Sequence, residues 1–281
     1  MRRFKVFKIF KIKGVFLFAI AFFLLPANAL ATSVVAVRNG DEIVLGADSS
    51  TTLTQLSDGM EVQKNMQKCK IVQAGNFFFA SAGFAGIGPA RAKIPGSIYP
   101  EFNLKRLIER ELAGGGKTRD KMDELERLLA INLSRIAEKA RREAPAFFVE
   151  KFIRHPLFSL VIAGIDDGRP VLFVMSFRLN AGASGVMTFD IDRYRCPGDC
   201  SSPDVAIFAG ETGAIRRYLS RNADFSSMAG PVEMVRSLVE LEISKAPSAV
   251  GPPVDILRLS ADGPQWVQKK DLCPEIQHTL P

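Results

Sequence analysis

Apolar residues occur along this chain in two patterns, short runs of strand length and longer segments where they recur every three to four positions. The short runs predict strands at residues 33–38, 41–47, 70–74, 77–82, 158–163, 171–177, 186–191, 205–209 and 254–259. The periodic segments predict helices that begin near Asn103 and Thr118, and two more at 213–220 and 231–246. Because like elements are grouped along the chain, this order predicts an α+β layered sandwich rather than alternating βαβ units.

The first two strands are expected to form a β-hairpin. Asn39-Gly40 is a two-residue turn signal between them. With that turn, Thr32 lies opposite Ala47. Asp48 then follows at the open end of the hairpin, so the pattern predicts a carboxylate beside Thr32.

A second hairpin is predicted with Gly75-Asn76 as its turn. The apolar run 77–79 reads as a buried strand. A two-residue turn places Lys70 opposite Ser81, and Gly83 follows at the same edge. This hairpin is therefore expected to present a lysine and a glycine at one end.

Residues 1–31 have the layout of a secretory signal peptide. They contain six basic side chains, then the apolar run 15–25, then small residues that end in Ala29-Leu30-Ala31. The run has eleven residues, whereas a membrane-spanning helix needs about 20. We therefore expect a cleaved leader rather than a membrane anchor, and a periplasmic or secreted protein.

Cleavage after Ala31 would make Thr32 the first residue of the mature chain. Its free α-amino group and its hydroxyl would then form a base and a nucleophile that need no histidine. Cleavage after Ala29 also fits the small-x-small rule and would leave Leu30-Ala31 ahead of Thr32. That product has a blocked amine unless it trims itself.

Charge separates the leader from the rest of the chain. The formal charge of +7 includes six basic leader residues and no acidic ones, so 7 − 6 leaves +1 for residues 32–281. A nucleic-acid-binding protein would need a clustered basic face, so we expect no nucleic-acid partner. Residues 32–281 are expected to form one domain.

Four cysteines in an exported chain permit disulfides, and three pairings are open if all four are used. They are Cys69, Cys196, Cys200 and Cys273. Cys196 and Cys200 are spaced to close a small loop. They are a poor zinc site, because no histidine and no second close cysteine pair lies nearby in the sequence.

Two further sequence features are interpreted structurally. Gly114–Thr118 looks like the end of a phosphate-binding loop, but Glu111 stands where that loop needs glycine, and a helix rather than a strand precedes it. We read it as a helix stop followed by a new helix start. The two histidines, His155 and His278, have no motif around them, which disfavours a histidine-based triad or metal site.

Several segments taken together resemble the proteasome β-subunit family of N-terminal nucleophile hydrolases. The segments are Thr32-Ser33-Val34-Val35-Ala36-Val37, Val44-Leu45-Gly46-Ala47-Asp48-Ser49, Lys70-Ile71-Val72 and Ser81-Ala82-Gly83. The resemblance covers roughly residues 32–86, with a looser similarity in 160–167 and 208–213. It implies a four-layer αββα sandwich with the fold of those hydrolases.

The resemblance also implies roles for named residues. Thr32 would be the nucleophile, Asp48 and Lys70 its charge partners, and Gly83 the oxyanion donor. Accessory positions are Ser33, Ser81 and Thr212. The chain departs from the family at residues 246–251, which lack the aspartate expected there.

The function predicted from the sequence is an exported N-terminal threonine hydrolase that cleaves a peptide or other amide bond through an acyl-enzyme, without metal or cofactor. One alternative is a catalytically inactive relative that serves as a binding or assembly subunit. Another is a hydrolase of small amides such as acylated amino acids. The expected partners are a peptide or small amide, with the membrane met only through the leader and homo-oligomerisation left open.

Overall fold

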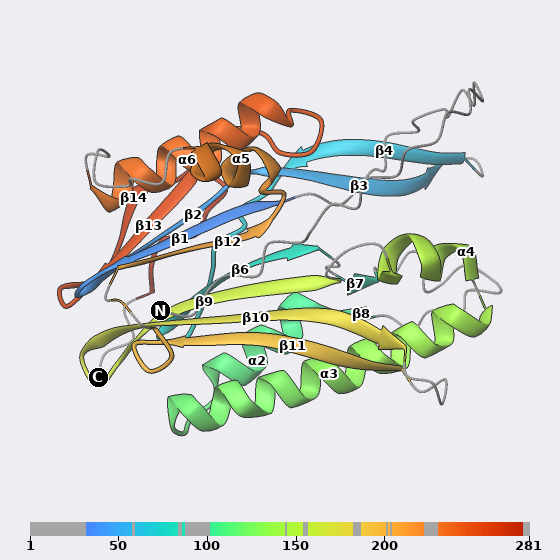
Figure 1. Cartoon of the computed structure of the whole chain (residues 1–281), viewed down its shortest axis with the longest axis horizontal. Coiled ribbons are helices and arrows are strands. Elements are labelled where there is room, and N and C mark those ends of the chain that lie inside the picture. The colour runs from blue at the N-terminus through green and yellow to red at the C-terminus, as the bar shows by residue number, and fades with distance from the viewer. Residues whose placement is uncertain are drawn as a thin grey trace, which may run out of the picture.

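The computed structural model describes residues 32–57, 60–83, 86–87, 102–143, 145–153, 157–181, 187–200, 202, 204–221 and 230–277. The predicted signal peptide at 1–31 and both histidines lie outside the described residues. Figure 1 shows two β-sheets that lie face to face, with helices on their outer sides. Within the described part of the chain, no helix is both long enough and apolar enough to cross a bilayer.

The first sheet, whose strand β1 begins directly after Thr32, has the strand order β12-β1-β2-β13-β14. Its strands are β12 (Val205–Gly210), β1 (Ser33–Asn39), β2 (Glu42–Ala47), β13 (Asp255–Ser260) and β14 (Gly263–Gln268). All neighbouring strands are antiparallel. The central strands β1 and β2 are buried over almost their whole length, as continuous apolar runs require.

The second sheet, of order β11-β10-β9-β6-β5, is also antiparallel. Its strands are β11 (Met187–Cys196), β10 (Arg169–Ala181), β9 (Phe158–Asp166), β6 (Phe77–Gly83) and β5 (Val72–Ala74). Two separate two-stranded sheets join β3 (Ser50–Ser57) to β4 (Met60–Gln67), and β7 (Gly86–Ile87) to β8 (Phe102–Asn103).

The helices follow the predicted apolar periodicity. They are α2 (Leu104–Ala113), α3 (Thr118–Glu143), the short α4 (Pro145–Phe148) with the π-helical turn η1 (Val149–Ile153), α5 (Gly213–Arg221) and α6 (Pro231–Lys245). The predicted start of α2 is confirmed, because the Asn103 side chain accepts a hydrogen bond from the backbone N–H of Arg106 at 3.1 Å. Since α2 rather than a strand leads into the glycines at 114–116, the reading of this segment as a helix stop is also confirmed.

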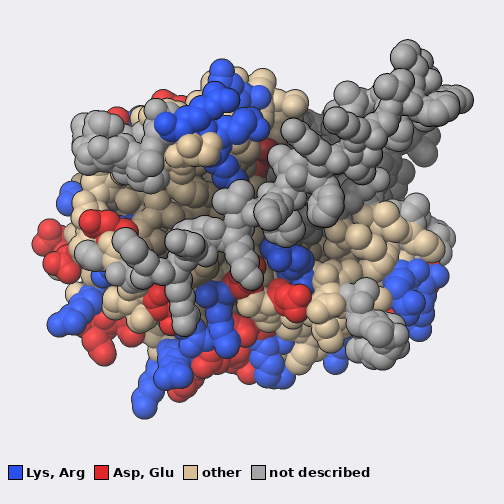
Figure 2. All heavy atoms as spheres, viewed as in Figure 1, with Lys and Arg blue, Asp and Glu red and all other residues tan. Residues whose placement is uncertain are grey.

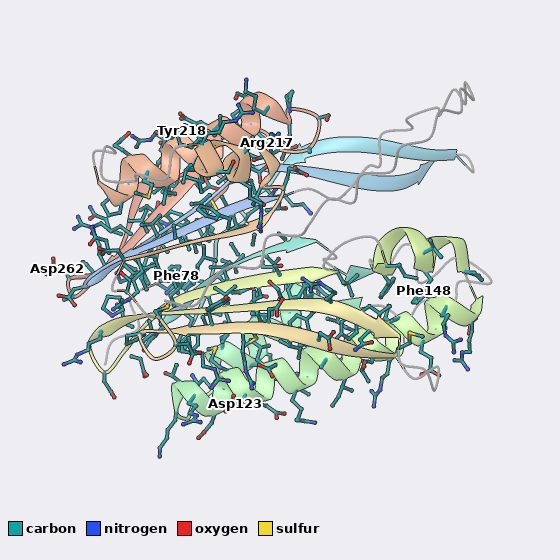
Figure 3. The ribbon with its side chains drawn as sticks, viewed as in Figure 1. Phe78, Asp123, Phe148, Arg217, Tyr218 and Asp262 are labelled. Atoms are coloured by element: carbon teal, nitrogen blue, oxygen red, sulfur yellow. A yellow bond between two sulfur atoms is a disulfide. The ribbon has the colours of Figure 1, made fainter. Side chains whose placement is uncertain are left out.

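Three apolar clusters hold these elements together. One lies between the second sheet and helices α2 and α3. A second lies between the two sheets, where Figure 3 shows Phe78. The third lies between the first sheet and helices α5 and α6. On the face drawn in Figure 2, acidic and basic side chains intermix over α3 and β11, where Arg193 and Glu126 form an ion pair at 3.0 Å.

The structure contradicts the predicted α+β, four-layer αββα sandwich of the N-terminal nucleophile hydrolases. The described residues form two antiparallel five-stranded sheets with helices, and two further two-stranded sheets lie outside them. The prediction gave no element to residues 50–57, 60–67, 86–87 or 102, and it placed Asn103 at a helix start. These segments pair with themselves as β3–β4 and β7–β8, because backbone N–H and C=O groups need partners whatever the side chains are.

The register predicted for the first hairpin is wrong by two residues. Val34, not Thr32, lies opposite Ala47. The turn is Gly40-Asp41, and only its glycine has a positive φ, of 56°. A two-residue turn with glycine at its first central position is favoured in hairpins. Since the shift is even, every side chain keeps its predicted face.

The register predicted for the second hairpin is confirmed. Gly75-Asn76 forms the turn, and Val72 lies opposite Phe79, the pairing that continues to Lys70 opposite Ser81. Lys70 itself precedes β5. Two disulfides, Cys69–Cys273 and Cys196–Cys200, settle the pairing that the sequence left open.

Candidate functional site

The candidate site lies where the first strand begins and the second strand ends. Thr32 immediately precedes β1 and Asp48 immediately follows β2. The backbone N–H of Asp48 donates to the Ser33 carbonyl at 3.2 Å, which continues the hairpin by one residue. The corrected register therefore still brings Asp48 to the start of β1.

Lys70 joins the two ends. Its ammonium donates to Thr32 Oγ1 at 3.0 Å and to Asp48 Oδ1 at 2.8 Å. The Asp48 side chain is fully buried, and that of Lys70 is 8% exposed. The three residues that the sequence singled out thus meet in one hydrogen-bonded group, in which Thr32 is half-buried.

The Asp48 carboxylate accepts hydrogen bonds at both oxygens. Oδ1 accepts from Lys70 and from the backbone N–H of Ser33 at 2.9 Å. Oδ2 accepts from the N–H groups of Ser50 at 3.0 Å and Gly251 at 3.1 Å. A buried carboxylate is costly unless donors surround it, and here Lys70 and three backbone N–H groups satisfy both oxygens of Asp48.

Opposing effects act on the Lys70 ammonium. Burial lowers the pKa of Lys70 below that of a free lysine, and the nearby Lys270 charge acts in the same direction. The Asp48 carboxylate raises this pKa through its charge and its hydrogen bond, but the net pKa of Lys70 stays lowered. Lys70 therefore gives up its proton more readily than a surface lysine does.

The predicted oxyanion donor Gly83 ends β6, the strand next to the site in the second sheet. A Cβ on Gly210 would lie 1.7 Å from the Thr32 carbonyl oxygen and 2.7 Å from the Ala82 side chain. The end of β6 therefore lies close to Thr32. Ser81 is in the same strand, and the roles assigned to it and to Gly83 stay predictions.

The other accessory positions have different surroundings. The Ser33 hydroxyl is buried and has no hydrogen-bond partner among the described residues. Thr212 Oγ1 accepts from Arg216 at 3.1 Å, one turn into α5. The neighbouring Glu211 N–H donates to the Thr32 carbonyl at 2.8 Å, so this segment fixes the Thr32 backbone.

Sequence reasoning missed a buried cluster next to the site and a buried carboxylate behind α5. The cluster consists of Ser49, Asp255 and Lys270, with an ion pair of 2.7 Å between the last two. The carboxylate is Glu242 of α6, which accepts from the first N–H groups of α5 and holds the start of that helix. No local motif marks these residues, because their partners are distant in sequence.

Cys69, Asp255 and Cys273 lie close enough together to be considered as metal ligands. The two sulfur atoms are joined in a disulfide and offer no thiolate, the form that binds metal. The donor set therefore does not fit a metal ion.

Gly210 provides a test of how tightly Thr32 is held. Gly210→Ala should disturb Thr32, because the added Cβ meets its carbonyl at 1.7 Å and the backbone has a φ of +82°. Strain of this kind costs about 1–3 kcal/mol by itself, so we expect a larger loss in the free energy of unfolding. Denaturant unfolding measures it.

The matched control is Gly263→Ala. Gly263 has a φ of +97° but no atom within 4 Å of an added Cβ, so it tests the strain without the clash. Equal losses in the two variants would contradict the close contact between Gly210 and Thr32.

No protein-family model and no curated protein matches the chain. The function is therefore inferred from the geometry of the site.

Proposed function

We propose that the protein is an exported N-terminal threonine hydrolase, as the resemblance to the proteasome β-subunit family suggests. It cleaves a peptide or other amide bond through an acyl-enzyme and uses no metal or cofactor. The observation that carries the proposal is the contact of Thr32 Oγ1 with Lys70 at 3.0 Å, backed by the buried Asp48. Such a nucleophile, charge partner and orienting group are the parts that covalent hydrolysis requires.

In the proposed reaction, removal of residues 1–31 frees the α-amino group of Thr32. The amine takes the proton of the Thr32 hydroxyl, and Oγ1 forms a bond to the substrate carbonyl carbon. The Lys70 ammonium stabilises the developing charge on Oγ1. The N–H of Gly83 donates a hydrogen bond to the oxyanion that forms on the substrate carbonyl oxygen. The C–N bond then breaks, with the proton passing to the leaving amine, and water releases the acyl group.

The amino terminus of the exported product tests the first step. Edman sequencing or intact mass should show Thr32 as the first residue. A product that retains Leu30-Ala31 yet turns over substrate would contradict the proposed base.

The pH dependence tests the charges of the site. We expect kcat/KM to rise as the amine loses its proton, near the usual α-amino pKa of about 7.7–8.0. It should fall again when Lys70 loses its proton, at a pH below the 10.5 of a free lysine, because burial lowers the pKa of Lys70. A profile still level above pH 10.5 would contradict a required Lys70 ammonium.

One observation favours a second candidate, a catalytically inactive binding or assembly protein. The loop at 246–251 supplies a backbone N–H from Gly251 to Asp48, not the carboxylate that the resemblance leads one to expect. Covalent capture by a threonine-reactive electrophile such as a peptide epoxyketone separates the two candidates. A product with a verified Thr32 amino terminus that captures no probe would favour the inactive protein.

A further inference from the structure

The segment after β14, residues 269–277, crosses from the first sheet to the second; we call it the C-terminal strap. The Trp266 indole of β14 donates to the Pro274 carbonyl at 3.3 Å. At the far end, Gln277 exchanges two hydrogen bonds with the Gln73 side chain of β5, at 2.8 and 2.6 Å. The strap therefore joins both sheets beside the segment that carries Lys70.

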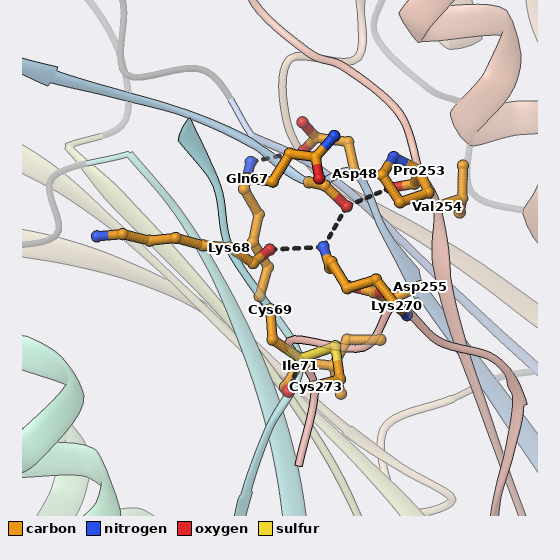
Figure 4. A network of polar contacts seen from close by, with 12 residues as sticks. Asp48, Gln67, Lys68, Cys69, Ile71, Pro253, Val254, Asp255, Lys270 and Cys273 are labelled. Atoms are coloured by element: carbon orange, nitrogen blue, oxygen red, sulfur yellow. Dashed lines mark hydrogen bonds and ion pairs between the residues drawn. A yellow bond between two sulfur atoms is a disulfide. The ribbon is translucent and has the colours of Figure 1, made fainter. Parts of the chain in front are cut away.

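Lys270 is the buried charged residue of the strap, and its ammonium has one ion-pair partner and two hydrogen-bond acceptors. It pairs with Asp255 Oδ2 at 2.7 Å, donates to the Lys68 carbonyl at 2.6 Å and donates to Ser49 Oγ. The backbone N–H of Lys270 also donates to Asp255 Oδ1 at 3.2 Å. Figure 4 shows this ammonium between the Lys68 carbonyl and the residues of the first sheet.

Each of these acceptors belongs to a segment that positions the candidate site. Ser49 follows Asp48 directly, and its N–H donates to the Gly251 carbonyl at 2.9 Å. Lys68 is two residues before Lys70, and its N–H donates to the Ser49 carbonyl at 3.0 Å. Lys270 thus fixes the distance between the segment with Asp48 and the segment with Lys70.

The disulfide Cys69–Cys273 fastens the strap at the same place. Cys69 lies between Lys68 and Lys70, and the N–H of Cys273 donates to the Lys270 carbonyl at 2.9 Å. The covalent bond therefore holds Lys270 against the Lys68 carbonyl (Figure 4).

We propose that Lys270 is a positioning residue for Thr32, Asp48 and Lys70, and that the Cys69–Cys273 disulfide must be formed for it to act. The inference rests on the proposed function for its effect on turnover, but not for its effect on Lys70. The Cys69–Cys273 disulfide thus makes the site competent only in the oxidised protein. A hydrolase so built stays inactive until its chain reaches an oxidising compartment.

The redox step is ordinary thiol–disulfide exchange. The thiols of Cys69 and Cys273 lose two protons and two electrons to a disulfide-bearing oxidant, which becomes a dithiol. In the reverse direction, a trialkylphosphine and water reduce the disulfide to two thiols, and the phosphine becomes a phosphine oxide. Reduction then leaves Lys270 held by non-covalent contacts alone.

The charged groups that face Lys70 set its pKa, and this pKa can be measured to test the inference. They are Asp48 after β2, Asp255 of β13 and Lys270 of the strap. The Lys270 charge lowers the pKa of Lys70. Moving or removing Lys270 should therefore raise the pKa of Lys70. Exposure of Lys70 would raise this pKa as well, because burial lowers it, so the variant must first show the near-ultraviolet circular dichroism of the unaltered protein.

The test uses Lys270→Met in the protein obtained by export of the full chain. We expect electrophile capture at Thr32 and kcat/KM to fall on the order of 10²-fold, the cost of a misplacement near 1 Å. The Lys70 titration, followed by the ¹³Cε signal of labelled lysine, should move to higher pH. Reduction with tris(2-carboxyethyl)phosphine, and the double variant Cys69→Ser/Cys273→Ser, should shift it in the same direction.

The matched control is Lys269→Met, which removes the adjacent lysine of the strap. Lys269 pairs with Glu275, whose side chain is 83% exposed, and should affect neither measurement. If Lys270→Met does not fold, Lys270→Met/Asp255→Asn removes both buried charges and replaces it in the electrophile-capture measurement, while reduction of the unaltered protein supplies the Lys70 titration, because the charges of Asp255 and Lys270 act on the pKa of Lys70 in opposite directions. A Lys70 titration equal to that of Lys269→Met, or unchanged by reduction, would overturn the proposal.

The two proposals fail in different ways. If Thr32 captures no electrophile but the Lys70 titration responds to Lys270 and to reduction, the hydrolase is wrong and the positioning role stands. If Thr32 is captured equally well with and without the disulfide, the hydrolase stands and the positioning role is wrong.

Discussion

Thr32→Ala should abolish hydrolysis while leaving the fold intact. The substitution removes Oγ1, the atom that Lys70 contacts at 3.0 Å, and leaves the buried pair of Lys70 and Asp48 in place. Loss of the nucleophile in a serine hydrolase costs on the order of 10⁶ in kcat, and we expect a loss on the order of 10⁴ to 10⁶ here. Steady-state kinetics on a peptide or acyl-amide library, with purified protein whose first residue is position 32, measures it.

Two companion variants make that result specific. Thr32→Ser keeps a hydroxyl on the first residue and should keep measurable turnover and electrophile capture. Ser244→Ala removes a hydroxyl on the exposed side of α6, where it donates to the Leu241 carbonyl, and should leave kinetics unchanged. Hydrolysis by Thr32→Ala at the rate of the Ser244→Ala protein would eliminate Thr32 as the nucleophile.

The meeting of Thr32, Asp48 and Lys70 was predictable because short-range strand pairing produces most of it. Apolar runs and glycine turns specify each hairpin, and an error of two residues in the first register left Asp48 at the same end. The layered sandwich was not predictable in the form expected. Segments such as β3 and β4 form by pairing with each other, and their sequences carry little apolar alternation.

The buried cluster around Lys270 and the disulfide beside it could not be predicted from the sequence for a different reason. Ser49 and Lys270 are 221 residues apart, and Cys69 and Cys273 are 204 apart. Their contacts depend on how the C-terminal strap crosses two sheets, and no periodicity or motif encodes that. A lysine shortly after a strand such as β14 is expected to be solvated until its burial is known.

Buried charge explains why both lysines belong to one arrangement. An ammonium out of water is costly unless carboxylates and carbonyls surround it. Lys70 has Asp48, and Lys270 has Asp255 and the Lys68 carbonyl. The two ion pairs share the segment from Lys68 to Lys70, so a change at one reaches the other.

Asp48→Ala should be the most destabilising single change in the site. It removes the acceptor of four donors at once: the Lys70 ammonium and the N–H groups of Ser33, Ser50 and Gly251. Removing one partner of a buried ion pair costs about 3–5 kcal/mol, and we expect the free energy of unfolding to fall by about that amount. A typical domain has only about 5–15 kcal/mol in total.

The comparison with Lys70→Met tells which half of the pair supports the fold. In Lys70→Met the carboxylate keeps its three backbone donors, so the free energy of unfolding should fall by less than in Asp48→Ala, although turnover is lost in both. Asp190→Ala is the control, because Asp190 is exposed on β11 and should change stability by no more than about 0.5 kcal/mol. Guanidinium unfolding followed by circular dichroism measures all three. If Lys70→Met proved the more destabilising variant, the three backbone donors would not be the main contacts that hold the buried Asp48 carboxylate in the fold, and the ion pair with Lys70 would have that role.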